Sequence, residues 1–139
     1  MKKILLDANI VLDVLLDRNP HAAASSAVWA AAETGKAKGV LPAHAVTTIH
    51  YIVRRERGGA AARNTMDKIL RVFDVAAVDS QVLRRALQFA WTDFEDAVTA
   101  AAAEMADCDA IVSRDPKGFP RSPIRVLAPE AAAAFLAIA

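Results

Sequence analysis

Short apolar runs alternate with longer segments of helical periodicity along this chain, and no other feature constrains its fold as strongly. A strand, a helix and a second parallel strand form a right-handed crossover, so the alternation predicts a parallel sheet covered by helices on both faces. The strand-like runs lie at residues 3–6, 39–42, 72–78 and 109–113, with a further candidate at 124–127. The helical patterns lie at residues 10–16, 21–34, 43–57, 60–69, 80–91 and 93–106, and another begins at Pro129. We therefore predict an α/β fold with a central, mostly parallel sheet of four to five strands.

Length and composition indicate a single soluble domain. The chain has 139 residues, of which 55% are hydrophobic, which is enough for one buried core, so we expect one domain over residues 1–139. Cys108 is the only cysteine, so no internal disulfide can form and a reducing, cytoplasmic location is expected. Acids interrupt the apolar N-terminal segment before it reaches the length of a signal peptide. No apolar run approaches the roughly 20 residues that span a bilayer, so no membrane partner is expected.

Two aspartates follow strand-like runs. Asp7 comes after the first run and Asp115 after the fourth, and in parallel sheets the ligand site forms at the carboxyl ends of the strands. Asp96 lies near the start of the helix that leads into the fourth strand, with Asp93 one turn before it. If the fold brings these carboxylates together, they form a site for a hard divalent cation.

The charges are unevenly distributed although the net charge is only +1. Residues 93–109 carry six acids and no lysine or arginine, whereas residues 54–71 carry six basic side chains and two acids. An acidic centre with basic flanks suits a cation-dependent enzyme that acts on a phosphodiester, because phosphates are contacted by lysine and arginine. The basic run is equally consistent with an ordinary solvated helix face.

Other classes of enzyme with acids at strand ends fit less well. A receiver-type phosphoacceptor domain has an acidic pair after its first strand, but here a single Asp7 is followed by Ala8 and Asn9. A haloacid-dehalogenase-type phosphatase requires Asp-x-Asp, and Asn9 breaks that pattern. No glycine-rich loop follows any predicted strand, which argues against a nucleotide-binding enzyme.

Three segments together resemble one known family. They are LDANIVLD at residues 6–13, DFEDAV at 93–98 followed by three alanines, and AIVSRD at 110–115 followed by Gly118 and Phe119. These segments are similar, in order, to the opening strand, the second acidic helix and the late strand of PIN-domain ribonucleases. The resemblance spans nearly the whole chain and implies a three-layer α/β/α sandwich.

The resemblance also implies an activity and partners. PIN-domain ribonucleases bind Mg²⁺ or Mn²⁺ through clustered acids and hydrolyse RNA phosphodiesters as endoribonucleases. Small single-domain members are commonly VapC-type toxins of toxin-antitoxin pairs, which are often dimeric and held inactive by an antitoxin. An RNA substrate, a cognate antitoxin and a homodimer are therefore expected.

The family's functional residues carry over by position. Asp7, Asp96 and Asp115 become the catalytic, metal-binding acids, and Asp93 lies where it can bind the metal through a water molecule. The expected supporting residues are Asn9, Ser113, Thr48 and His50. Arg114 and Lys117 are the expected RNA contacts.

One position departs from the family pattern. PIN domains usually carry a further acid in the helix after the second strand, and here His50 falls at that position, with Thr48 close by. Imidazole is a poor ligand for Mg²⁺, although it is acceptable for Mn²⁺ or Zn²⁺. His50 is therefore either a replacement ligand or a helix residue without a role. Two functions remain open: a metal-dependent endoribonuclease, or a catalytically weak PIN-like protein that binds RNA or an antitoxin.

Overall fold

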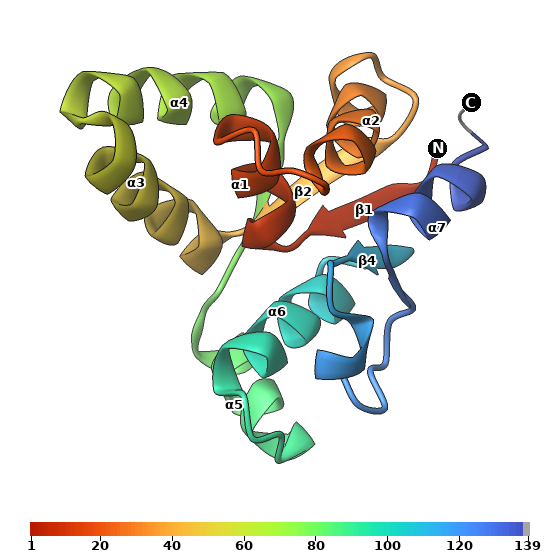
Figure 1. Ribbon diagram of the computed structural model, residues 1–139. Helices are drawn as coiled ribbons and strands as arrows, with labels where there is room; N and C mark the ends of the chain where they lie inside the picture. The colour runs from red at the N-terminus through yellow and green to blue at the C-terminus, as the bar shows by residue number, and fades with distance from the viewer. Residues whose placement is uncertain (138–139) are drawn as a thin grey trace.

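Five parallel strands form the centre of the molecule (Figure 1). The computed structural model describes residues 1–137. The strands are β1 (Lys3–Leu6), β2 (Lys38–Pro42), β3 (Asp74–Ala76), β4 (Ala110–Val112) and β5 (Val126–Leu127). They pair in the order β3-β2-β1-β4-β5, and every neighbouring pair is parallel. The predicted sheet is confirmed, including its fifth strand.

The helices lie in two groups on opposite faces of this sheet. They are α1 (Ala8–Leu15), α2 (Ala22–Glu33), α3 (Ala43–Arg57), α4 (Gly59–Val72), α5 (Ser80–Phe89), α6 (Phe94–Met105) and α7 (Pro129–Phe135), with a short 3-10 helix at Pro116–Gly118. Helices α1 to α4 and α7 contribute to one apolar cluster, and α5 and α6 contribute to the other (Figure 1). This is the three-layer α/β/α sandwich that the family resemblance implied. Within residues 1–137, no helix combines the length and the apolar character needed to cross a membrane.

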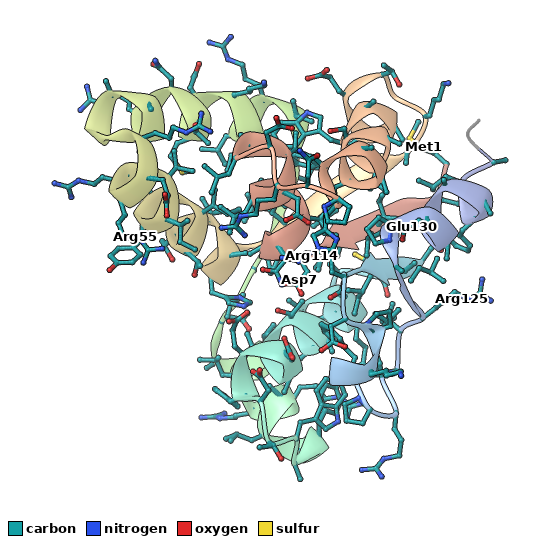
Figure 2. The ribbon with its side chains drawn as sticks, viewed as in Figure 1. Met1, Asp7, Arg55, Arg114, Arg125 and Glu130 are labelled. Atoms are coloured by element: carbon teal, nitrogen blue, oxygen red, sulfur yellow. The ribbon has the colours of Figure 1, made fainter. Side chains whose placement is uncertain are left out.

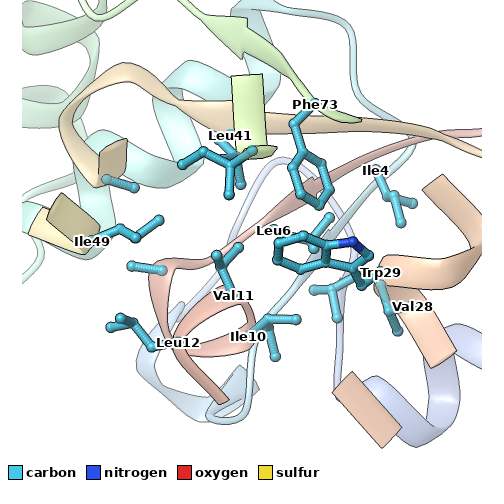
Figure 3. Packing of buried hydrophobic residues seen from close by; sticks show 14 of the residues in the cluster. Ile4, Leu6, Ile10, Val11, Leu12, Val28, Trp29, Leu41, Ile49 and Phe73 are labelled. Carbon is cyan, nitrogen blue, oxygen red and sulfur yellow. The ribbon is translucent and has the colours of Figure 1, made fainter. Parts of the chain in front are cut away.

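Alternate residues of the central strand supply the two apolar clusters. In β1, Ile4 and Leu6 pack into the first cluster while Leu5 packs into the second, as the two-residue period of a strand requires. Ile111 in β4 likewise lies in the second cluster, opposite to its two neighbours in that strand. Figure 3 shows the first cluster, in which Trp29 of α2 lies over β1. Because both faces are buried, these strands appear in the sequence as continuous apolar runs.

A glycine permits the close packing of α2 and β2. An ideal Cβ on Gly39 would lie 2.6 Å from the Phe73 ring and 2.8 Å from the Cβ of Ala32. The Phe73 ring in turn meets Trp29 edge to face, with their ring centroids 5.1 Å apart (Figure 3). Any larger residue at position 39 would displace this aromatic pair from the core.

The predicted bounds were least accurate where α4 meets β3. The apolar run at residues 72–78 predicted one strand, but Val72 ends α4 and packs on the first cluster, and β3 covers only Asp74–Ala76. Strand β3 is an edge strand, and its Val75 is exposed. The run is therefore divided between a helix end and a short edge strand, which have the same apolar composition.

The carboxyl ends of β1 and β4 meet at the centre of the molecule. The backbone N–H of Asp7 donates to the carbonyl of Val112 at 2.9 Å, which extends the ladder between these strands by one residue. Asp7 is thereby held in the middle of the fold, close to Arg114, as Figure 2 shows. Acidic side chains from α6 and from the segment after β4 gather around this point.

Candidate active site

Asp7 is a buried carboxylate held by two fixed groups. It is the N-cap of α1, and its Oδ1 accepts from the N–H of Ala8 at 2.8 Å. Its Oδ2 accepts from the hydroxyl of Ser113 at 3.0 Å. Burial raises the pKa of Asp7 above its usual value, while the bonds from Ser113 and Ala8 act in the opposite direction. The side chain is thus oriented by its neighbours yet lacks full compensation for its charge.

Ser113 connects Asp7 to Asp115. The buried Ser113 hydroxyl that donates to Asp7 also accepts from the backbone N–H of Asp115 at 3.2 Å. The position of the Asp115 backbone is therefore fixed relative to the end of β1. The Asp115 carboxylate itself is exposed and faces the same cavity as Asp7.

Asp96 is contributed by the first turn of α6. Asp93 is the N-cap of this helix, and its Oδ1 accepts from the N–H of Asp96 at 3.0 Å. Burial raises the pKa of Asp96 to about 7, and the carboxylates of Asp93, Asp7 and Glu95 add to this effect by repulsion. Negative charge is thus concentrated at this end of α6.

Gly118 leaves room between two of these carboxylates. An ideal Cβ on Gly118 would lie 3.2 Å from Oδ2 of Asp96 and 3.2 Å from Oδ2 of Asp115. The two oxygen atoms are therefore at most twice that distance apart. The 3-10 helix after β4 thus brings Asp115 to face α6.

These residues line one cavity of about 300 Å³ at the carboxyl end of the sheet. Its lining includes the three predicted catalytic acids and the predicted Asp93, Asn9, Ser113 and Thr48. The remaining lining residues are Ala8, Leu12, Ile52, Glu95 and Phe119. Segments that are far apart in the sequence therefore converge on one carboxylate-rich site, as the strand-end rule predicts for Asp7 and Asp115.

Comparison with sequence families matches residues 3–117 to the PIN domain. The chain belongs to the PIN domain family. A search of curated protein sequences gave no match.

Solved structures of a VapC toxin and of VapBC complexes have a similar fold. VapC20 of Mycobacterium tuberculosis, a Sarcin-Ricin loop cleaving toxin, superposes with a TM-score of 0.64 at 15% identity, covering 78% of this chain and 86% of that chain. DNA-bound VapBC from Salmonella typhimurium superposes with a TM-score of 0.72 at 14% identity, covering 93% of this chain and 99% of that chain. VapBC2 from Rickettsia felis, bound to a promoter DNA fragment, superposes with a TM-score of 0.70 at 12% identity, covering 91% of this chain and 98% of that chain. At these identities the similarity establishes the fold.

Thr48, not His50, faces the carboxylates of this PIN domain. Thr48 and Ile52 lie one helical turn apart on α3, and both line the acidic cavity. His50 lies about 200° around the helix from Thr48 at 3.6 residues per turn, and it lines a separate groove between α3 and α4. The structure therefore does not bring His50 to the site. The position from which α3 could supply a fourth carboxylate is occupied by the hydroxyl of Thr48.

Glu95 lines the PIN site and His44 contacts Glu95, although neither residue was predicted from the sequence. Glu95 lines the cavity, and burial and the carboxylates of Asp7 and Asp93 raise its pKa. His44 lies one turn before Thr48, with its Nε2 3.9 Å from Oε1 of Glu95 and 3.3 Å from Oγ1 of Thr99. Burial lowers the pKa of His44, which favours its neutral form. The sequence signal for Glu95 was its position between Asp93 and Asp96; His44 gave none.

Arg114 is bound to a buried acid and does not line the cavity. Its Nε lies 2.9 Å from Oδ2 of Asp13, a fully buried residue in the middle of α1 that the sequence had not distinguished from an ordinary turn or cap acid. Ser25 donates to the same carboxylate oxygen at 3.5 Å. The Nε–H of Arg114 is not aligned with the carboxylate, so the contact is an ion pair and not a hydrogen bond. The other carboxylate oxygen, Oδ1 of Asp13, also has no hydrogen-bond partner in residues 1–137. Lys117, the other predicted RNA contact, is exposed beside Asp115.

The donor set of the PIN site fits a hard divalent cation. All the acidic donors are carboxylate oxygens, and the raised pKa of Asp96 indicates negative charge that a cation would neutralise. In the described part of the chain, no three His, Cys, Asp or Glu side chains are arranged so that they could hold a metal ion together. Water molecules, which Mg²⁺ in proteins usually retains, would therefore bridge some of the carboxylates of Asp7, Asp96 and Asp115 to a bound ion.

Proposed function

We propose that this PIN domain is a metal-dependent endoribonuclease and the toxin of a type II toxin-antitoxin pair. The observation that carries the proposal is the convergence of Asp7, Asp96 and Asp115 on one cavity, next to a serine that orients Asp7. The likeness in fold to a toxin that cleaves the Sarcin-Ricin loop, and to VapBC complexes, supports it.

The residues divide the chemistry of phosphodiester hydrolysis between them. Asp7, Asp96 and Asp115 would hold Mg²⁺ or Mn²⁺, and Asp93 would contact it through water. When bound, such an ion lowers the pKa of a water nucleophile and neutralises charge on the phosphate oxygens. Ser113 holds Asp7 in one orientation and ties it to Asp115. The exposed Lys117, two residues after Asp115, would contact an adjacent phosphate.

The proposed partners are an antitoxin, a second copy of the chain and RNA. Val28 and Trp29 of α2 are buried in the core, so the alanine-rich face of this helix does not offer them to a second copy. Leu83 and Leu87 on α5 are exposed one turn apart, and they are better placed for such a contact. The lone buried Cys108 is in keeping with a cytoplasmic location.

We expect purified protein, freed of any bound antitoxin by denaturation and refolding, to cleave RNA only when a divalent cation is present. Without an ion the crowded carboxylates repel the phosphate, so EDTA should abolish cleavage and either Mg²⁺ or Mn²⁺ should restore it. Gel analysis of end-labelled structured RNA measures this. Refolded protein that leaves RNA intact with both ions would contradict the nuclease proposal.

A second function, in which the fold only binds RNA or an antitoxin, is favoured by one observation. The cavity has Thr48 where α3 could supply a further carboxylate, so metal affinity depends on fewer charges. The two functions predict different effects on metal-dependent cleavage when a carboxylate is introduced at position 48.

We expect Thr48→Glu to lower the Mn²⁺ or Mg²⁺ concentration needed for half-maximal cleavage. The added carboxylate would face the cavity, and changes near metal ligands typically alter affinity by about 10- to 100-fold. Thr47→Glu is the matched control, because it makes the same substitution at an exposed threonine of the same helix that lines neither the acidic cavity nor the groove of His50. Metal titrations of cleavage compare the two variants. Equal effects of the two substitutions would show that Thr48 does not occupy the ligand position.

A further inference from the structure

A basic groove lies between α3 and α4, outside the acidic cavity. The two helices are joined at Gly58, contact each other, and diverge away from this junction (Figure 1). The groove has a volume of about 510 Å³. It is lined by His50 and Arg54 of α3 and by Gly59, Ala60, Arg63 and Asn64 of α4.

The two arginines of this groove lack acidic partners, in contrast to Arg55 and Arg71 on the same helices. Arg55 lies 3.6 Å from Glu56, and Arg71 lies 3.0 Å from Asp67. Within residues 1–137, neither Arg54 nor Arg63 forms an ion pair, and both are exposed. The groove therefore presents two free guanidinium groups, and an ideal Cβ on Gly59 would meet nothing within 4 Å, so the groove is open there.

The groove and the acidic cavity share helix α3. Thr48 and Ile52 of α3 line the cavity, and His50 and Arg54 line the groove. Thr48 and Arg54 are separated by about 9 Å along the helix axis at 1.5 Å per residue. A polynucleotide chain that reaches the carboxylates meets repulsion there, so cationic side chains outside the cavity would have to supply its binding energy. Arg54 lies about 240° around α3 from Thr48, so the groove is on the other side of this helix and a bound chain would pass around α3 to reach the cavity.

We propose that the α3–α4 groove binds the phosphate backbone of single-stranded RNA whose scissile bond lies in the acidic cavity. Arg54 and Arg63 contact phosphates, and His50 and Asn64 supply ring and amide groups that bases can stack on or bond to. The groove contains Ala60 as its only apolar side chain among the described lining residues, so it lacks the apolar anchors of a protein-binding groove. The inference rests on the proposed nuclease function for the position of the scissile bond.

Binding of RNA to a cleavage-deficient protein tests the groove separately from catalysis. In an Asp7→Asn background, fluorescence anisotropy with labelled single-stranded RNA is measured over a series of salt concentrations. The groove variant carries Arg54→Gln and Arg63→Gln. The control carries Arg55→Gln and Arg71→Gln, which remove the same charge from paired arginines on the same two helices. All four side chains are exposed, and thermal melting verifies that each variant folds.

We expect the groove variant to bind RNA at least tenfold more weakly than the control. The slope of log affinity against log salt is negative, and it should become less steep by about 0.7 for each phosphate that the groove no longer binds. Equal RNA affinity and equal salt dependence for the two variants would overturn the proposal. The proposal would also fail if binding of an acidic polyglutamate peptide depended on Arg54 and Arg63 while RNA binding did not. Groove-dependent RNA binding by a wild-type protein that never cleaves RNA would refute the nuclease and leave the groove assignment standing.

Discussion

Replacing Asp96 with asparagine should abolish RNA cleavage and, at the same time, stabilise the metal-free protein. Asparagine keeps the size of the side chain but removes an anionic metal ligand. A held metal ion supplies several kcal/mol of charge stabilisation, and about 4 kcal/mol corresponds to roughly a thousandfold in rate. In the metal-free protein the same substitution removes repulsion, because burial and the carboxylates of Asp93, Asp7 and Glu95 raise the pKa of Asp96 to about 7.

The stabilisation should depend on pH in a defined direction. The pKa of Asp96 is raised in the folded protein from an ordinary value of 3.8 to about 7, so the folded state holds this proton more tightly than the unfolded state does. The stability from proton binding is fully present below about pH 3.8 and is lost as the pH rises through about 7. The metal-free wild type should therefore lose stability relative to Asp96→Asn as the pH rises from about 4 to about 7.

Thermal melting in EDTA at several pH values, with and without Mn²⁺, measures this behaviour. The side chain is partly open to solvent, so we expect a gain of only about 1 kcal/mol, which corresponds to roughly 4 °C for a domain of this size. Mn²⁺ should stabilise the wild type and not the variant. Asp107→Asn is the control, since it makes the same chemical change at an exposed residue beyond the far end of α6. A melting temperature for Asp96→Asn equal to or below that of the wild type at pH 8 would contradict the charge argument.

The fold was predictable because its central strands are buried on both faces. Ile4 and Leu6 pack on one side and Leu5 on the other, so no polar residue interrupts the run. The edge strand β3 was less predictable, because exposed Val75 and helix-ending Val72 have the same apolar character. Strand boundaries at an edge depend on pairing, which the local sequence does not contain.

The candidate site was predictable where it follows from chain topology. Asp7 and Asp115 were placed by the rule that parallel strands bring their carboxyl ends together, and the cavity contains both. Whether Thr48 or His50 faces the cavity could not be predicted in this way. The sequence shows which residues share a face of α3, but the face that meets the cavity is set by the packing of α3 on its neighbours.

The pairing of Asp13 with Arg114 had no local signal either. An acid within an apolar helix pattern ordinarily lies on the solvated face. Asp13 is instead fully buried, because the segment after β4 brings Arg114 against α1. Arg114 was predicted as an RNA contact from its position next to Asp115, and only the tertiary structure shows the partner that it has.

Replacing Arg114 with alanine should destabilise the protein severely. The substitution leaves the Asp13 carboxylate buried without a cation, with Oδ1 already lacking a hydrogen bond and Ser25 at 3.5 Å as the remaining donor. Breaking a buried pair from one side typically costs about 3 to 5 kcal/mol. Domains are generally stable by only about 5 to 15 kcal/mol, so a large part of the total is at stake. Urea denaturation followed by circular dichroism measures the free energy of unfolding.

The double variant Asp13→Leu with Arg114→Met separates the ion pair from the buried charge. Exchanging both partners for apolar residues of similar size removes the unpaired carboxylate, and such replacements are often neutral or stabilising. The double variant should therefore recover the stability that Arg114→Ala loses. Lys117→Met removes an exposed cation from the same segment and should leave stability unchanged. An unfolding free energy for Arg114→Ala within about 1 kcal/mol of the wild type would show that the pair does not clamp this segment.

The stable double variant also tests whether the pair positions the site. Arg114 lies between Ser113, which binds Asp7, and Asp115, so its tie to α1 fixes the segment that carries both residues. Without the tie, Asp115 should hold its place less well, and we expect metal affinity to fall by about 10- to 100-fold although the fold is intact. Isothermal titration with Mn²⁺ measures this directly. Full metal affinity in the double variant would limit the Asp13–Arg114 pair to a role in stability, whereas a stable protein with weakened metal binding would identify Arg114 as a positioning residue of the candidate active site.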